Sequence, residues 1–193
     1  MLAQALAFVL DTLFHLFILA ALLRFWMQAL RAPARNPIAQ FTMALTDFAV
    51  KPLRRLIPGL LNLDWASLVV ALAFEFLLQF LLVLIIGASP NADVVSVLLF
   101  LAFVKLFRLT IYIFMGAIIV QAVLSWVNPH HPVAPFFQAL TRPFLKPFQR
   151  AVPLIGGVDI TPALVLIALQ LVLMLPVTWL ETESIRMLQR ALL

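Results

Sequence analysis

Ionisable and amide side chains interrupt long apolar runs of this 193-residue chain. Asp11 and His15 are four residues apart in the first run, and Glu75 and Gln79 are four apart in the second. Residues at that spacing share one face of a helix. Gln170 interrupts the last run, 95 residues after Glu75. A charge in hydrocarbon costs roughly 2.5–3.5 kcal/mol on insertion scales, so we expect these groups to face neighbouring helices and to pair there.

Three kinds of chemistry fit this set. His15 and Glu75 could form a proton or ion relay, or His15 could ligate a haem or a metal. The simpler role is hydrogen bonding between helices, worth under about 1 kcal/mol for each bond. The pair His130–His131 lies in a proline-flanked loop and is too isolated to predict a metal site.

Known catalytic motifs are missing from the sequence. It contains no HExxH, no phosphate-binding glycine loop and no Ser–His–Asp arrangement. We therefore expect a protein that is not an enzyme and that binds no cofactor or metal.

A second set of polar residues belongs to a motif that occurs twice, at 36–64 and 131–159. An offset of 95 residues aligns the copies without a gap, and 11 of the 28 positions from 37 to 64 are identical. The motif residues are Pro37, Phe41, Lys51, Pro52, Arg55, Pro58 and Asp64, and then Pro132, Phe136, Lys146, Pro147, Arg150, Pro153 and Asp159. A gap-free internal repeat indicates a duplicated architecture.

Each copy predicts an amphipathic helix, because its apolar residues fall on one arc of a helical wheel. The arcs hold Ile38, Phe41, Leu45, Phe48 and Ala49, and Val133, Phe136, Phe137, Leu140 and Phe144. We expect Pro52 and Pro147 to end these helices, each beside a basic cluster. We expect each helix to lie in the cytoplasmic leaflet, with its cations near anionic headgroups. The alternative is that packing against the spans holds the loops.

Asp64 and Asp159 precede the second and fourth apolar runs. We expect capping, with Ser67 three residues after Asp64 and with Thr161–Pro162 as an N-cap followed by proline at the first helical position. The alternative is that these carboxylates bind a cation or a partner between the two halves.

The composition places these groups in a membrane protein. The chain is 65% hydrophobic and 11% charged, with a mean hydropathy of +1.12. Soluble domains are about 45–50% apolar and about 25% charged, so the soluble class is excluded. The net charge of +5 then predicts cytoplasmic loops and anionic lipid, not nucleic acid.

The apolar runs predict an all-α integral membrane fold. We expect four transmembrane helices, at about 3–23, 66–86, 106–127 and 163–180, since about 20 apolar residues cross the hydrocarbon core. Residues 1–93 then form a first span–loop–span repeat, and residues 94–193 a second one with a polar C-terminal tail.

Two stretches of the second half need interpretation. We favour one long helix from 94 to 127, with Lys105 and Arg108 snorkelling to the headgroups. The alternative is a separate interfacial helix at 94–105. Pro176 should kink the fourth span near its end, and the tail from 181 onward should form an interfacial helix.

The basic residues predict the orientation. The two repeat loops hold 9 of the 13 Lys and Arg residues, and the others are Lys105, Arg108, Arg186 and Arg190. The positive-inside rule places these loops in the cytoplasm and both termini in the periplasm. Each half then starts on the same side, so we expect parallel repeats related by an axis along the membrane normal.

The doubled motif K-P-x-x-R…P…D, each copy followed by a span, resembles the YggT family of bacterial and plastid membrane proteins. The resemblance covers nearly the whole chain and matches the duplicated form of the family. One departure is Leu60–Leu61–Asn62 in the first copy, where the second has Ile155–Gly156–Gly157, the glycine pair that is more typical of the motif.

The resemblance implies a non-enzymatic inner-membrane protein. It implies roles in osmotic or ion stress, in the organisation of division or nucleoid, or in haem attachment in plastids. Our first hypothesis is a multi-pass assembly, organisation or stress-related factor that contacts anionic lipid, a membrane-protein partner or a second copy of itself. The alternatives are a small ion or solute transporter or channel component, and a haem or cofactor assembly factor.

Overall fold

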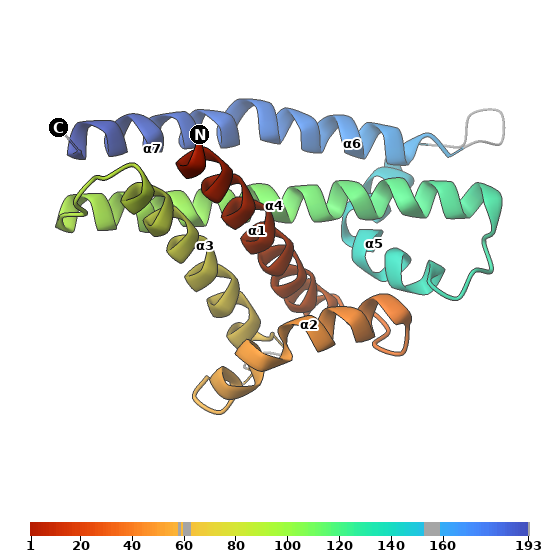
Figure 1. Cartoon of the computed structure of the whole chain (residues 1–193). Helices are drawn as coiled ribbons and strands as arrows, with labels where there is room; N and C mark the ends of the chain where they lie inside the picture. The colour runs from red at the N-terminus through yellow and green to blue at the C-terminus, as the bar shows by residue number, and fades with distance from the viewer. Residues whose placement is uncertain (58, 60–62, 153–158, 193) are drawn as a thin grey trace.

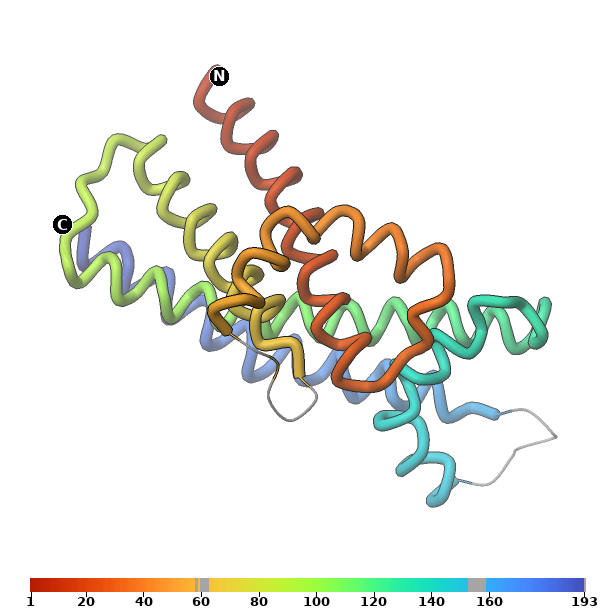
Figure 2. The backbone as a smooth tube through the Cα atoms, turned by 90° about the horizontal axis from the view of Figure 1, so that it is seen from below, coloured from red at the N-terminus to blue at the C-terminus, as the bar shows by residue number. Residues whose placement is uncertain are grey.

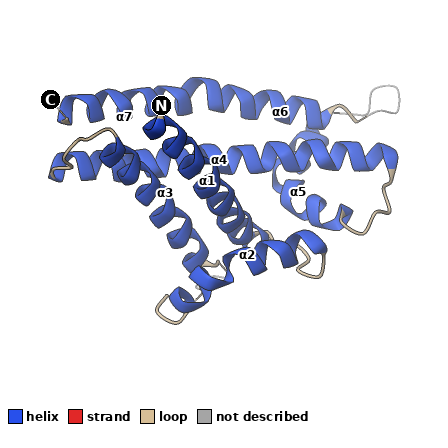
Figure 3. Ribbon diagram, viewed as in Figure 1, coloured by secondary structure: helices blue, strands red, loops and turns tan. Residues whose placement is uncertain are grey.

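The computed structural model describes residues 1–57, 59, 63–152 and 159–192. Its helices are α1 (Leu2–Ala29), α2 (Pro37–Arg54), α3 (Trp65–Ile85), α4 (Ala92–Val127), α5 (Ala134–Ala151), α6 (Thr161–Val172), the π-helical turn η1 (Leu173–Val177) and α7 (Thr178–Ala191). Figure 3 shows how helices dominate the chain. The motif prolines Pro58 and Pro153, and the turn positions 60–62 and 155–157, lie outside the described residues.

Four helices are long and apolar enough to cross a membrane: Leu2–Ala29, Trp65–Ile85, Ala92–Val127 and Thr161–Ala191. α1 packs against α3, and both contact α4, while α6 and α7 lie along α4 (Figure 1). α2 follows α1 and packs against both α1 and α3, and α5 packs against α4 and α6 (Figure 2). A long helix, a short helix and a second long helix therefore follow one another twice along the chain.

α4 confirms the prediction of one long helix and excludes a separate helix at 94–105. It begins after Asn91, whose side-chain oxygen accepts a hydrogen bond from the backbone N–H of Val94 at 2.8 Å. Its 36 residues make it about 54 Å long. That exceeds the hydrocarbon thickness of about 30 Å, so α4 must tilt or extend beyond the hydrocarbon.

The last long helix continues beyond the predicted span at 163–180. The helical path continues from α6 through η1 into α7 and ends at Ala191, not near residue 180. Pro176 lies inside the π-helical turn, which accommodates its missing N–H. The tail is helical, as predicted, but it continues α6 and η1 without a break, and α7 packs against α4, where Leu188 contacts the cluster around Leu98. Its place at the membrane interface stays a prediction.

The prediction that Pro52 and Pro147 end their helices is wrong. α2 continues to Arg54 and α5 to Ala151, and α5 also contains Pro143. A proline within a helix removes one backbone hydrogen bond and disfavours the helical conformation of the residue before it, without forbidding it. Buried contacts of the neighbouring Val50 and Leu145 offset that cost.

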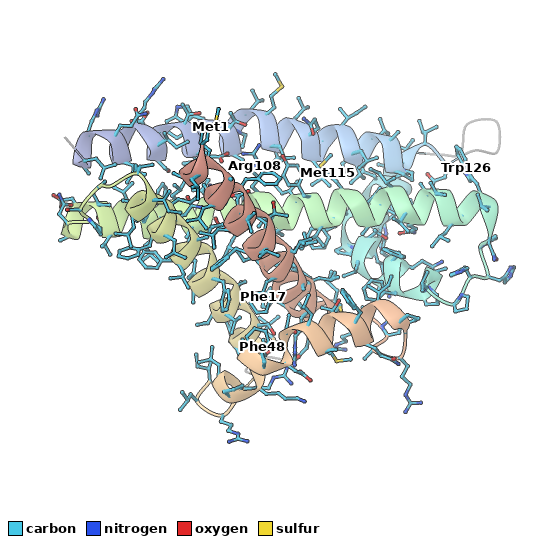
Figure 4. All side chains as sticks on the ribbon, viewed as in Figure 1. Met1, Phe17, Phe48, Arg108, Met115 and Trp126 are labelled. Atoms are coloured by element: carbon cyan, nitrogen blue, oxygen red, sulfur yellow. The ribbon has the colours of Figure 1, made fainter. Side chains whose placement is uncertain are left out.

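Two hydrophobic clusters fasten the short helices to the long ones. The first joins α1, α2, α3 and α4 through residues such as Ile18, Val50 and Val70. Phe17 of this cluster contacts Phe48 of α2, with ring centroids 5.3 Å apart; both residues are labelled in Figure 4. The second cluster contains Met27, Ala39, Ala117, Phe136 and Leu140, and so joins α1, α2, α4 and α5.

Candidate functional site

A polar cluster lies between α1 and α3. Glu75 of α3 is fully buried, and the side-chain amide of Gln79, one turn later, donates a hydrogen bond to Glu75 Oε1 at 2.8 Å. Glu75 Oε2 is buried and has no hydrogen-bond partner among the described residues. His15 Nε2 of α1 lies 3.9 Å from this oxygen. The structure thus brings together four of the predicted intramembrane residues: Asp11, His15, Glu75 and Gln79.

The position of the His15 ring indicates where its protons lie. Its Nδ1 is 2.8 Å from the backbone carbonyl oxygen of Asp11 and 3.4 Å from Asp11 Oδ1. A carbonyl oxygen only accepts hydrogen bonds, so we assign a proton to Nδ1. In a neutral ring, Nε2 then directs a lone pair at the Glu75 carboxylate.

α4 adds a residue that the sequence did not associate with this cluster. Lys105 lies near enough for its charge to act on Glu75. Arg108 pairs with Glu181 of α7 and donates to Tyr112 Oη at 3.2 Å, and its place at the headgroups stays a prediction. The crossing of α4 over α3 brings Lys105 close, and no sequence spacing encodes that crossing.

Gln170 does not join the cluster. Its side chain is exposed, although it corresponds to the buried Glu75 at the 95-residue offset. Within the described part of the chain, no three His, Asp or Glu side chains gather closely enough to hold a metal ion.

In the first motif copy, Asp64 is a buried N-cap. It accepts hydrogen bonds from the backbone N–H of Ser67 at 3.4 Å and from the Ser67 hydroxyl at 2.7 Å, as the capping prediction required. It also pairs with Arg54 of α2 and lies 3.5 Å from Arg24 Nε of α1. Burial raises the pKa of Asp64, but hydrogen bonds from Arg54 and Ser67 outweigh it, so the pKa lies below the usual value.

Arg24 joins three elements although it lies at the end of an apolar run. It is buried, and its Nη1 donates to Thr46 Oγ1 and to Asp47 Oδ1, both at 2.8 Å. Asp47 also pairs with Lys51 at 2.7 Å. The Lys51 hydrogen bond, followed by that of Arg24, lowers the pKa of Asp47 despite some desolvation. Arg24 of α1 and the motif cations Lys51 and Arg54 therefore each pair with a carboxylate of the protein.

The second copy makes a related cap with different chemistry. Asp159 accepts a hydrogen bond from the backbone N–H of Thr161 at 2.8 Å and one from Gln149 Nε2 at 3.0 Å. Thr161 is the first helical residue, not the N-cap. Gln149 occupies the position of Arg54, so an uncharged donor replaces the cation. Desolvation opposes these hydrogen bonds, but the net pKa of Asp159 is still lowered.

A cavity of about 390 Å³ lies beside Asp159, between α4, α5 and α6. Its walls include Gln121, Gln149 and Ile119. Ile119 occupies the position of Arg24, whose guanidinium links Asp47 and Asp64 in the first copy. The second copy thus has no guanidinium at this position to link its short helix to the start of α6.

The two motif phenylalanines lie in different environments. Phe41 is 68% exposed, whereas Phe136 is 1% exposed and packs with Met27 and Ala39 of the first half. The second helix therefore covers its apolar arc with protein, and the first leaves its arc open. Lipid contact stays a prediction for Phe41.

The remaining motif residues have local roles. Pro37 is the first residue of α2, after the N-cap Asn36, whose side chain accepts from the Ala39 N–H at 2.9 Å. Pro132 precedes α5. The cations Arg55, Lys146 and Arg150 are exposed.

Four long apolar helices, two short helices packed at their ends and a buried polar cluster define a helical protein of the multi-pass membrane class. The CCB3/YggT family profile matches residues 3–85 and 100–180. The chain belongs to this family.

Its relatives include uncharacterized bacterial proteins. The chain is 34% identical to one from Pseudomonas aeruginosa over 170 residues, which is 87% of this chain and 86% of the relative. It is 33% identical to the protein of the proC 3′ region in Vibrio alginolyticus, over 86% of this chain and 90% of that one. It is 31% identical to uncharacterized protein YggT of Escherichia coli K12, over 88% and 87%. No solved structure matches.

Proposed function

We propose that the protein is a non-catalytic organising or assembly factor of the bacterial inner membrane. Its two halves are parallel repeats whose short helices α2 and α5 lie on the cytoplasmic face. There they present a fixed surface to lipid and to a membrane-protein partner. The observation that carries the proposal is the orientation of α2.

α2 has an unusual distribution of side chains for a helix on a protein surface. Its buried residues are small or polar: Ala39, Thr42, Thr46 and Val50. Its large apolar residues are exposed: Phe41, Leu45 and Phe48. They follow one another at spacings of four and three residues and so form one stripe. A contiguous exposed apolar stripe marks a contact with membrane or partner.

α2 is also rigidly fastened. Arg24 binds Thr46 and Asp47, and Arg54 binds Asp64 at the start of α3. These contacts fix the apolar stripe relative to the ends of two spans. An apolar stripe fixed at the ends of the spans suits a surface that positions other membrane components. Such a surface requires no catalytic group.

Cysteine labelling tests the orientation of α2, because the chain contains no cysteine. Phe41→Cys and the matched control Gln40→Cys, at an exposed neighbour on the same helix, are treated with a membrane-impermeant maleimide in inverted membrane vesicles. We expect Gln40→Cys to react quickly and Phe41→Cys to be protected. Equal reaction rates of the two cysteines would contradict the proposal that the stripe is covered.

A photoreactive residue at position 48 then identifies what covers the stripe. Phe48 is exposed and lies on the same stripe as Phe41. We expect adducts with lipid and with one reproducible membrane protein, both absent when the photoreactive residue is placed at Gln40. Adducts with lipid alone would restrict the stripe to membrane anchoring and would count against a partner-organising role.

The orphan oxygen of Glu75 supports a second candidate, a proton-conducting or ion-conducting pathway. Glu75 Oε2 faces His15 Nε2 across 3.9 Å, and Asp11 connects this pair to the more exposed side of α1. Proton flux into proteoliposomes tests it. A pathway through this cluster predicts flux that Glu75→Gln abolishes and that Gln170→Leu, at the exposed corresponding position, leaves unchanged. The absence of flux above empty vesicles would eliminate this candidate.

A further inference from the structure

α5 carries a groove lined by three cations. Arg142, Lys146 and Arg150 are four residues apart, so they fall within an arc of about 80° on one side of the helix and span about 12 Å. All three side chains are exposed. The groove has a volume of about 490 Å³, and its other walls are Leu30, Ala139, Pro143 and Pro147.

These cations have no acidic partner within the described part of the chain. The first copy differs at the corresponding positions. Asp47 stands where Arg142 stands, and it pairs with Lys51, the counterpart of Lys146. The corresponding stretches differ in charge: residues 37–56 carry Asp47, Lys51, Arg54 and Arg55, a net charge of +2, whereas 132–151 carry only the three cations of the groove, +3. Orientation in the membrane requires loop charge, but it does not require that Lys51 pair with a carboxylate while its counterpart Lys146 has none among the described residues.

We infer that this groove binds the phosphate headgroup of an anionic phospholipid in the cytoplasmic leaflet. The two guanidinium groups can each donate paired hydrogen bonds to phosphate oxygens, and Lys146 adds a point charge between them. The apolar wall of Leu30, Pro143 and Pro147 suits the glycerol and the first methylenes of the lipid. The inference rests on the proposed cytoplasmic placement of α5, but it does not depend on what covers α2.

The packing of α5 favours a lipid over a soluble anion. The side of α5 away from the groove is buried through Phe136, Leu140 and Leu145, so the cations cannot move away from the ends of the spans. Leu30 directly follows α1, a helix long and apolar enough to cross the membrane. A phosphate at the end of such a helix lies at the headgroup layer.

Native mass spectrometry of the full chain in detergent tests the inference, with phosphatidylglycerol and phosphatidylcholine as the added lipids. The site variant is Arg142→Gln/Lys146→Gln/Arg150→Gln. The control is Arg31→Gln/Arg35→Gln/Arg55→Gln, which removes three exposed cations from the first loop and lowers the net charge equally. We expect the parent and the control to hold one phosphatidylglycerol with the same affinity. The site variant should bind it on the order of a hundredfold more weakly, since each cation near an anionic surface contributes roughly fivefold.

A second variant separates loss of the site from loss of the fold. Lys146→Gln alone removes the central charge of an exposed trio and should weaken phosphatidylglycerol binding roughly fivefold. The inference is overturned if the control loses as much affinity as the site variant, because binding would then follow net charge alone. It is also overturned if inorganic phosphate displaces the lipid, or if phosphatidylcholine binds equally well. Protection of Phe41→Cys would be unaffected by any of these results, so failure here is distinguishable from failure of the proposed function.

Discussion

Asp64 and Asp159 occupy the same motif position, at the starts of α3 and α6, but among the described residues only Asp64 pairs with arginine side chains. Asn caps a helix about as well as Asp, so Asp159→Asn should be nearly neutral. Asp64→Asn keeps the cap but leaves Arg24 and Arg54 without this carboxylate, and should cost about 1.5–3 kcal/mol. Thermal unfolding of both variants in detergent, followed by circular dichroism, measures the difference. Equal losses would show that capping alone accounts for the role of Asp64.

The same ion pairs predict the acid limit of stability. The pKa of Asp64 and that of Asp47 are lowered in the folded protein. A carboxylate whose folded pKa lies below its unfolded value stabilises the fold above the unfolded value, and the contribution disappears as the pH falls through the folded pKa. The unfolding midpoint should therefore be level from neutral pH to about pH 5 and should fall below about pH 4. Asp64→Asn should flatten that fall, which a pH series of melting curves would reveal.

His15 and Glu75 allow a test of coupling within the membrane. Glu75→Gln should be mild, because the amide still accepts from Gln79 and can hydrogen-bond to the ring. Glu75→Leu should destabilise the fold more while His15 is present than in a His15→Leu background. Residues in contact couple by about 0.5–3 kcal/mol, so a double-mutant cycle from unfolding measurements decides. Additive effects of the two substitutions would show that His15 and Glu75 do not interact.

The local chemistry of single residues was largely predictable. A carboxylate directly before an apolar run predicted the Asp64 cap, and the spacings of four predicted that Asp11 and His15, and Glu75 and Gln79, share a helix face, where each two are in contact. Arg24 was interpreted only as a loop cation. Its buried contacts with Thr46 and Asp47 depend on how α2 folds back against α1, and no local pattern states that arrangement.

At the scale of elements, α2 and α5 have related sequences and different surroundings. The helical wheel predicted an apolar arc on each, but it could not indicate what would cover that arc. Phe136 lies in a cluster with residues of α1, α2 and α4, whereas Phe41 is exposed. Because the second half packs onto the first, the arc of α5 is covered by protein and that of α2 is not.

This difference predicts opposite effects of truncation. Phe136→Ala should destabilise the protein by about 3–5 kcal/mol, the usual cost of deleting a buried phenylalanine side chain. Phe41→Ala should change stability in detergent by less than about 0.5 kcal/mol, as for most exposed sites. Unfolding curves in one detergent compare the two directly. A large loss for Phe41→Ala would mean that α2 is held by its phenylalanines and not by the Arg24 contacts.

At the scale of the whole molecule, the number and type of long helices followed from hydropathy, because four predominantly apolar runs of about 20 residues are typical of membrane spans. The residues at which these helices end did not follow from hydropathy. The sequence predicted a span to about residue 180 followed by a helical tail, but not that the two would be continuous, with α7 packed along α4 and Arg108 paired with Glu181. Hydropathy reports how favourably a segment partitions into lipid. It carries no information on whether a polar helix packs against another helix, as α7 does against α4.

Orientation in the membrane remains the broadest prediction. In the structure, α2 and α5 lie away from the N-terminus and from the α3–α4 turn (Figure 1). These two short helices and their flanks hold most of the Lys and Arg residues, so the positive-inside rule places them in the cytoplasm. Reporter fusions after Gly87 and after Leu193 should both report the periplasm, and a fusion after Arg55 should report the cytoplasm. Cytoplasmic activity at both Gly87 and Leu193 would show that the protein has the opposite orientation in the membrane. The groove of α5 would then face the outer leaflet, and the lipid assigned to it would have to be sought there.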